Sequence, residues 1–142
     1  LYEQWKSMNA DGKWRFTSPT HAVMAFAKAM EELEQEGGIP VRHARYTANQ
    51  RLLALRFGEM GFKPYLDPSV QGPIITTFYY PEGAKFGFRE MYDYIKQRGY
   101  VLYPGKVMEA ETFRVGNIGE IYAADIEAVS AIMKEFLQEV SA

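Results

Sequence analysis

The sequence predicts an α+β domain in which helices pack on one face of a small, mostly antiparallel sheet. Apolar residues recur at helical spacing in four segments of the chain. Short runs of β-branched and aromatic residues lie between prolines and glycines, which is typical of strands. The 142 residues suit one domain, and 47% of them are hydrophobic, which favours a packed core. The expected order is helix, helix, strand, strand, helix, strand, strand, helix.

Two helices are expected in the first part of the chain. The Ser18-Pro19 pair predicts where the first one starts, because serine is a favoured N-cap and proline fits the first helical position. The Gly37-Gly38 pair ends this helix. The second helix is expected to run from near Pro40 to Gly61. The predicted buried residues are Val23, Phe26, Ala27, Met30 and Leu33 in the first helix and Val41, Ala44, Ala48, Leu52 and Leu55 in the second.

Four strands and two helices are expected in the rest of the chain. The clearest strand is "PIITTFYYP", residues 73–81, and "FKPYLDP" before it is a weaker one. Two further strands are predicted by "YVLYPG" and "TFRVG". The helices are indicated by apolar residues at helical spacing, which are Phe88, Met91, Tyr92 and Ile95 before Gly99, and Ile126, Val129, Met133, Phe136 and Val140 near the end. A linker-like turn is expected at "NADGK", residues 9–13.

The composition excludes several classes of function. A formal net charge of −2 provides no basic field, so no nucleic-acid partner is expected. The absence of cysteine excludes a disulfide framework, a thiolate metal site and a cysteine nucleophile, and it is compatible with the cytoplasmic location that we expect. No apolar run approaches the roughly 18 residues that span a bilayer. No cluster of His, Asp or Glu has the spacing of metal ligands, so no metal site is expected.

One arginine lies among strand residues directly before a glycine turn. Arg114 in "TFRVGNIG" is followed by Gly116 and Gly119, which would let a ligand approach closely. Arginine is always charged and rarely fully buried without a partner. The residue is therefore either a surface or salt-bridged arginine or a clamp for a carboxylate or phosphonate, which a guanidinium binds through two parallel hydrogen bonds. The residues alone leave both interpretations open.

A second candidate anion site lies in "WRFTSPTH", residues 14–21. The hydroxyl groups of Thr17, Ser18 and Thr20 gather where the first predicted helix starts. The free N–H groups and the dipole of a helix N-terminus attract anions. A simple helix cap made by one of these side chains is the alternative interpretation.

Other candidate catalytic residues have plainer explanations. His43 in "RHARY" has no matched carboxylate and is interpreted as a helix-surface residue, as is His21. Lys106 in "YPGKV" follows a turn that is expected to be exposed, whereas a Schiff-base lysine needs a desolvated or cation-flanked amine. No serine has a nucleophile-elbow sequence with a histidine and an acid as partners. The residues by themselves therefore show no complete catalytic set.

Taken together, these blocks resemble a known family. "GKWRFTSPTHAVMAFAKAMEELEQEGGIPVRHARYTANQRLL", "PIITTFYYP", "GYVLYPGKV" and "TFRVGNIGEIY" follow one another as in the 2-aminoethylphosphonate–pyruvate aminotransferases, which belong to class V of the fold-type I pyridoxal-phosphate enzymes. The resemblance covers essentially the whole chain but only the C-terminal part of the family. It implies that residues 1–18 cross from a large cofactor-binding domain upstream and that residues 19–142 form the C-terminal small domain. The start at Leu1, rather than at methionine, fits that expectation.

The resemblance implies roles for two residues. Thr17 in "RFTSP" matches the family threonine whose hydroxyl and amide reach the cofactor phosphate of the neighbouring subunit. Arg114 in "FRVGNIG" matches the family arginine that binds the acidic end of the substrate, either a phosphonate or a carboxylate. No catalytic residue is implied in this chain, because the family places the lysine that bonds to the cofactor, and the aspartate that pairs with its ring nitrogen, in the large domain. Lys106 does not match that lysine.

The resemblance also implies a reaction. The amino group of 2-aminoethylphosphonate would pass reversibly to pyruvate, giving phosphonoacetaldehyde and alanine, in a homodimer that uses pyridoxal 5'-phosphate. The chain alone is expected to be inactive, because it lacks the catalytic lysine. Two alternatives stay open. One is another class V aminotransferase acting on alanine, serine or glyoxylate partners, and the other is a free-standing anion-binding or interaction module.

Overall fold

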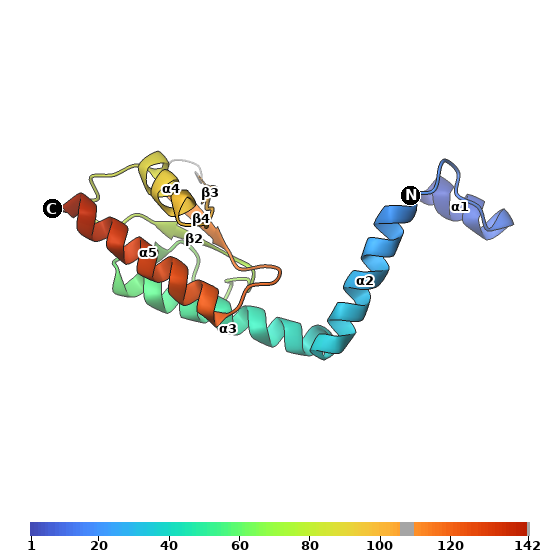
Figure 1. Cartoon of the computed structure of the whole chain (residues 1–142), viewed down its shortest axis with the longest axis horizontal. Coiled ribbons are helices and arrows are strands. Elements are labelled where there is room, and N and C mark those ends of the chain that lie inside the picture. The colour runs from blue at the N-terminus through green and yellow to red at the C-terminus, as the bar shows by residue number, and fades with distance from the viewer. Residues whose placement is uncertain (106–109, 142) are drawn as a thin grey trace. The chain divides into compact units, whose positions relative to one another are not determined.

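The computed structural model describes residues 1–105 and 110–141, and these fall into two compact units (Figure 1). The first unit is Leu1–Ile39 and the second is Pro40–Ala142. The order of elements matches the predicted order, with one additional helix at the beginning. The predicted boundary after residue 18 concerns the domains of the intact enzyme, and it stays a prediction.

The first unit holds two helices, α1 (Tyr2–Asp11) and α2 (Thr20–Glu36). The sequence did not predict α1, because four apolar residues in ten, one of them alanine, are too few to establish a helical period. The expected turn at residues 9–13 lies later than predicted, since α1 continues to Asp11. The helix ends at Gly12, whose φ of 73° is in the left-handed region that favours glycine.

The start and the buried face of α2 both differ from the prediction. The helix begins at Thr20 with Pro19 in the N-cap position, and no side chain caps it. Ser18 instead accepts a hydrogen bond from the N–H of Thr20 through its carbonyl oxygen, at 2.9 Å. None of the residues of α2 is buried, although its apolar spacing is regular. The periodicity correctly shows which face of α2 is apolar. Burial of that face would need another element packed against it, and the described part of the chain does not bury it.

The helix α3 (Gly38–Glu59) begins two residues before the predicted start at Pro40. Its buried residues are Asn49, Leu53 and Phe57, so the predicted stripe is wrong apart from Leu52, which is partly buried and packs against the core. Leu53 is 0% exposed, whereas Leu55 from the predicted stripe is 56% exposed. Apolar residues lie on several sides of this helix, and periodicity alone could not select the buried side.

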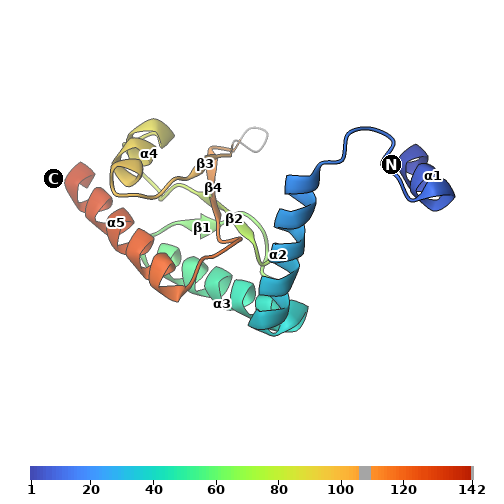
Figure 2. The same cartoon turned by 45° about the vertical axis from the view of Figure 1, so that its right-hand side comes forward.

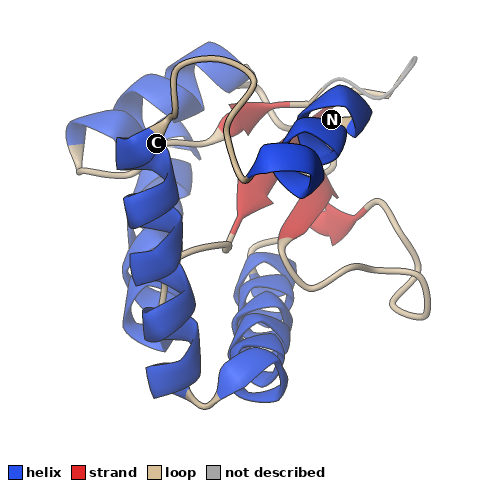
Figure 3. Ribbon diagram, turned by 90° about the vertical axis from the view of Figure 1, so that its right-hand side faces the viewer, coloured by secondary structure: helices blue, strands red, loops and turns tan. Residues whose placement is uncertain are grey.

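The four strands of the second unit form one antiparallel sheet, coloured red in Figure 3. The strands are β1 (Lys63–Pro64), β2 (Ile75–Tyr79), β3 (Tyr103–Pro104) and β4 (Thr112–Gly116). Their spatial order is β1-β2-β4-β3, and each neighbouring pair is antiparallel. The register places Thr77 of β2 and Tyr103 of β3 opposite Arg114 of β4. Each strand lies within a segment that the sequence predicted.

Helices cover one face of this sheet, as predicted. They are α3, α4 (Phe88–Gln97) and α5 (Ala123–Ser141), and α3 and α5 lie side by side in Figures 1 and 2. The sheet contributes the buried residues Phe78, Phe113 and Val115 to the core. The predicted apolar residues of α5 are confirmed, because Ile126, Val129, Met133 and Phe136 are buried and Val140 packs against them.

The centre of the core is aromatic. The ring centroid of Phe57 lies 4.9 Å from that of Phe78 and 5.3 Å from that of Phe62. Phe113 lies 5.4 Å from Phe62 and 5.9 Å from Phe78. These contacts join α3 to the two central strands, and they bring β4 into a rigid part of the molecule.

Much of the opposite face of the sheet stays exposed. Side chains alternate between the two faces of a strand, so the burial of Phe113 and Val115 sends Arg114 to this exposed face. Ile75, Tyr79 and Tyr103 are also exposed. In the part of the chain that the structure describes, no helix is long and apolar enough to cross a membrane.

An ion pair with two hydrogen bonds connects α3 to α5. The Nε of Arg56 donates to Oε2 of Glu127 at 2.8 Å, and its Nη2 donates to Oε1 at 2.7 Å. Arg56 also donates to Glu59 at 3.3 Å. The hydrogen bond from Arg56 lowers the pKa of Glu127 below its ordinary value of 4.5. Both side chains are partly exposed, so solvent screens the pair and its contribution to stability is small.

This pair predicts how stability changes with pH. A carboxylate with a lowered folded-state pKa stabilises the fold above about pH 4.5, and the effect is lost as the pH falls through the lower folded value. We expect Glu127→Gln to unfold at a lower urea concentration than the wild type at pH 7, and the difference to be smaller at pH 3. Urea titrations at both pH values measure this. The control is Glu32→Gln in α2, which removes an exposed charge; a Glu127→Gln deficit that is equally large at pH 3 would contradict the assignment.

Candidate functional site

Arg114 projects from the exposed face of a strand whose other face is packed into the core. Its exposed side chain makes no hydrogen bond or ion pair within residues 1–105 and 110–141. Arg114 is thus not a salt-bridged arginine within the described residues. A guanidinium with free donors on a rigid strand can bind a planar or tetrahedral anion through two hydrogen bonds. The predicted role in substrate binding itself stays a prediction.

The turn after β4 is held by polar contacts with α3. Asn117 is buried, its N–H donates to the carbonyl of Ile74 at 2.9 Å, and its Nδ2 donates to the carbonyl oxygens of Tyr46 and Pro73. The hydroxyl of Tyr46 accepts a hydrogen bond from the N–H of Gly119 at 3.0 Å. The turn that follows Arg114 is therefore tied to a helix and to the start of β2.

Two further residues of α3 bind the same segment. Nη1 of Arg45 donates to the carbonyl oxygens of Gly119 at 2.8 Å and Ile121 at 2.9 Å. The buried Asn49 donates to the carbonyl of Ile121 at 2.7 Å. The guanidinium of Arg45 also lies 4.8 Å from the ring centroid of Tyr122. Arg45 is thereby bound to backbone oxygens in the fold.

Thr17 lies in the first unit, three residues before α2. Its side chain is exposed and makes no hydrogen bond with the described residues. The hydroxyl of Thr20 lies 3.3 Å from that of Ser18 and donates to it, and no side chain caps the helix. Because no side chain caps α2, its first turn keeps open N–H groups besides that of Thr20, which is bonded to Ser18, and such groups can receive an anion. The assignment of Thr17 to a cofactor phosphate stays a prediction.

The other candidate catalytic residues are two histidines and a lysine. His43 in α3 and His21 in α2 are both exposed. Lys106 lies outside the described residues. Arg114 belongs to the unit Pro40–Ala142 and Thr17 to the unit Leu1–Ile39.

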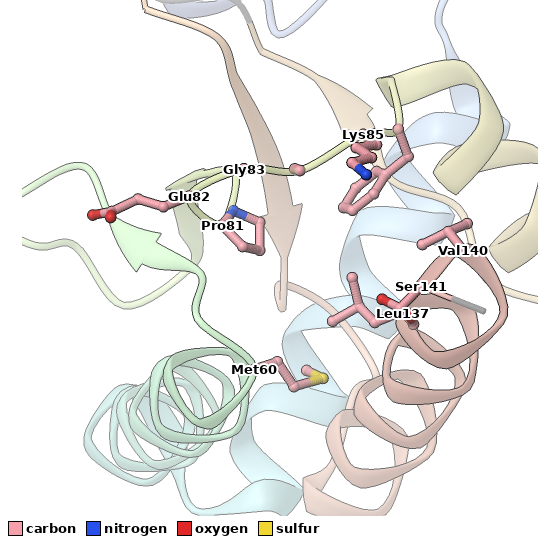
Figure 4. Close-up of a pocket in the computed structure, with 10 residues that line it drawn as sticks. Met60, Pro81, Glu82, Gly83, Lys85, Leu137, Val140 and Ser141 are labelled. Carbon is pink, nitrogen blue, oxygen red and sulfur yellow. Dashed lines mark hydrogen bonds between the residues drawn. The ribbon is translucent and has the colours of Figure 1, made fainter.

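A hollow of about 430 Å³ lies where the loop after β2 faces the end of α5 (Figure 4). Met60, Leu137 and Val140 line one side of it, and Glu82 and Lys85 lie on the loop. Glu82 accepts a hydrogen bond from Lys63 at 2.8 Å, so its charge is compensated. The hollow includes neither Arg114 nor Thr17 and has no arrangement of groups for a reaction.

Curated relatives match most of the chain. A 2-aminoethylphosphonate–pyruvate transaminase of Klebsiella pneumoniae is 53% identical over 132 residues, which are 92% of this chain and 36% of that protein. The enzyme of the same name from Bacillus thuringiensis is 54% identical over 127 residues, 89% of this chain and 34% of that protein. The chain thus spans about a third of the length of these relatives. A search of family models found no match.

Solved structures show the same fold. The ureidoglycine–glyoxylate aminotransferase of Bacillus subtilis has a TM-score of 0.81 at 19% identity, covering 99% of this chain and 37% of that one. The alanine–glyoxylate aminotransferase of Nostoc has a TM-score of 0.78 at 19% identity, covering 90% of this chain and 34% of that one. At 19% identity these similarities show the fold alone. The resemblance to the 2-aminoethylphosphonate–pyruvate transaminases is therefore confirmed, over about nine tenths of this chain and about a third of theirs.

Proposed function

We propose that the chain is the C-terminal part of an aminotransferase that moves the amino group of 2-aminoethylphosphonate to pyruvate, giving phosphonoacetaldehyde and alanine. The observation that carries the proposal is Arg114, an exposed guanidinium without a partner among the described residues, in a chain 53% identical to a transaminase of that name. Both substrates carry an anionic group that such a guanidinium can bind. A homodimer and a cytoplasmic location belong to the same proposal.

The role of Arg114 is to orient the substrate. The guanidinium binds the phosphonate or carboxylate at one end of the substrate, which restricts where the reacting amine or carbonyl can lie. Positioning of this kind lowers the entropic part of the barrier. The packed core beneath β4 keeps the strand from moving, so the arginine stays in place during the reaction.

Pyridoxal 5'-phosphate is the proposed cofactor of the intact enzyme, where it supplies an electron sink for the amino-transfer chemistry. Thr17 and the uncapped start of α2 fit its phosphate, because they offer a hydroxyl, open N–H groups and the positive end of a helix dipole. In the proposed homodimer this phosphate belongs to the neighbouring subunit. The lysine and aspartate that complete the cofactor site are proposed to lie outside this chain.

The choice of amino donor tests the proposal. The intact enzyme is assayed with pyruvate and either 2-aminoethylphosphonate or serine, and alanine formation is measured. We expect 2-aminoethylphosphonate to be consumed and serine to be a poor donor. Turnover of serine alone would instead support another class V aminotransferase, and no turnover of either donor would support a binding module.

Replacement of Thr17 tests the cofactor contact. Thr17→Ala in the intact enzyme is expected to weaken cofactor retention by about ten- to a hundredfold, because a hydrogen bond to a charged group contributes roughly 1.5–3 kcal/mol. Equilibrium dialysis followed by cofactor absorbance measures this affinity. Thr17→Ser keeps the hydroxyl and should retain the cofactor. Equal retention in the alanine variant would remove Thr17 from the site.

A further inference from the structure

The side chain of Arg114 occupies the space that a side chain at position 105 would need. Gly105 is buried and directly follows β3, the strand paired with β4. An ideal Cβ at Gly105 would lie 2.6 Å from Cγ of Arg114, 2.9 Å from its Nε and 3.1 Å from its Cδ. A real Cβ essentially never lies closer than 3.0 Å to a heavy atom outside its own residue and its two chain neighbours. The arginine stem therefore lies against the backbone of Gly105, and only glycine permits this position.

The backbone conformation is not the reason for a glycine here. Gly61, Gly99 and Gly119 have φ angles of 89°, 91° and 93°, in the region that other residues rarely adopt. Gly105 is not among the glycines with a positive φ, so alanine could adopt its backbone conformation. The requirement for glycine comes from the space that Arg114 fills.

A buried threonine holds Gly105 in place. Thr112 is 5% exposed and lies two residues before Arg114 on β4. Its hydroxyl donates a hydrogen bond to the carbonyl oxygen of Gly105. Since β3 is only two residues long, this side-chain bond extends the connection between the two strands beyond the end of β3. The surface on which the arginine stem rests is thereby fixed to the strand that carries the arginine.

We propose that Gly105 is a positioning residue for Arg114, and that Thr112 holds Gly105 in the required position. Gly105 leaves a channel for Cγ, Cδ and Nε of the arginine, so the guanidinium is held in one direction before the substrate arrives. A side chain that is already ordered loses less conformational entropy when it binds an anion. This inference rests on the proposed function, because it explains how the clamp for the anionic substrate group is aimed.

Gly105→Ala in the intact enzyme tests the steric part. The added methyl group forces the stem of Arg114 into another rotamer, and we expect the KM for the substrate whose anion Arg114 binds to rise at least about tenfold. The turnover number and the retention of cofactor should change much less. Gly72→Ala is the matched control, because its Cβ meets nothing within 4 Å and its φ is not positive. A KM as low as that of the control would overturn the inference.

A double-mutant cycle separates positioning from general structural damage. Gly105→Ala should raise KM in the wild-type background and have almost no further effect in the Arg114→Ala background, because its effect passes through the arginine. An equal increase in both backgrounds would show that the methyl group damages the fold instead, and would overturn the inference.

Thr112 offers a second test that adds no atoms near Arg114. Thr112→Val removes the hydroxyl at nearly constant shape and is expected to raise KM in the same direction, whereas Thr112→Ser keeps the donor and should restore the wild-type value. Equal KM values for the valine and serine variants would contradict the role of Thr112.

The outcomes also distinguish this inference from the proposed function. If Arg114→Ala leaves KM unchanged for both 2-aminoethylphosphonate and pyruvate, the clamp itself is absent and the proposed function loses its support. If Arg114→Ala raises KM but Gly105→Ala does not, the clamp stands and the positioning role of Gly105 is wrong.

Discussion

Replacing Arg114 by alanine in the intact enzyme is expected to raise the KM of its anionic substrate at least about a hundredfold. Two hydrogen bonds to a charged group contribute roughly 1.5–3 kcal/mol each, and 1.4 kcal/mol corresponds to a factor of ten. Cofactor binding should survive, because the proposed phosphate contact lies at Thr17, which belongs to another unit of the chain. Steady-state kinetics with 2-aminoethylphosphonate and with pyruvate measure the effect and identify which anion Arg114 binds.

Two further variants make this result specific. Arg114→Lys should restore little of the lost affinity, because lysine keeps the charge but lacks the planar pair of donors. Arg51→Ala removes another exposed arginine, one that makes no hydrogen bond or ion pair with the described residues, and should leave KM unchanged. Wild-type kinetics in the Arg114→Ala variant would end the clamp hypothesis.

Leu53→Ala is expected to cause a large loss of stability. This side chain is 0% exposed and belongs to the core between α3 and the sheet. Removing a buried leucine side chain costs about 2–5 kcal/mol, because apolar contacts are lost and a cavity is left behind. Leu55→Ala makes the same chemical change two residues away, at a side chain that is 56% exposed. Its expected cost in this chain is within about 0.5 kcal/mol.

Urea unfolding of the two variants in the 142-residue chain, compared with the wild type, measures this difference. The comparison also decides between two descriptions of α3, since the sequence alone placed Leu55 in the buried stripe and omitted Leu53. A larger loss of stability in Leu55→Ala than in Leu53→Ala would show that the structure has the wrong face of α3 buried.

The strands and the last two helices could be predicted because their signals are local. The runs that became β2 and β4 are rich in β-branched and aromatic residues and have prolines or glycines beside them. Along α5, a single apolar face matches the buried face. In α2 an apolar face exists but stays exposed, and in α3 several sides are apolar. The prediction of buried residues failed in α3 because the pattern left more than one side possible, and in α2 because the described residues do not cover its apolar face.

The residues of the candidate site also differ in whether a local sequence pattern predicts them. Arg114 could be found from its residue type and its place before a glycine turn, and Thr17 from the start of a helix. Arg45 and Asn117 could not be found, because their partners lie about 70 residues away in the sequence. Gly105 looked like an ordinary turn glycine, since its role depends on a contact with the neighbouring strand.

The sequence by itself determined the fold class, the strands and the two polar residues proposed to bind anions, because residue type and spacing act over a few neighbouring residues. Only the tertiary structure decided which side of α3 is buried and that Arg114 leaves the sheet on its uncovered face. It also decided that the arginine stem rests on Gly105. These features depend on the pairing of strands and the packing of helices far apart in the chain, where burial and steric exclusion, rather than local propensity, set the outcome.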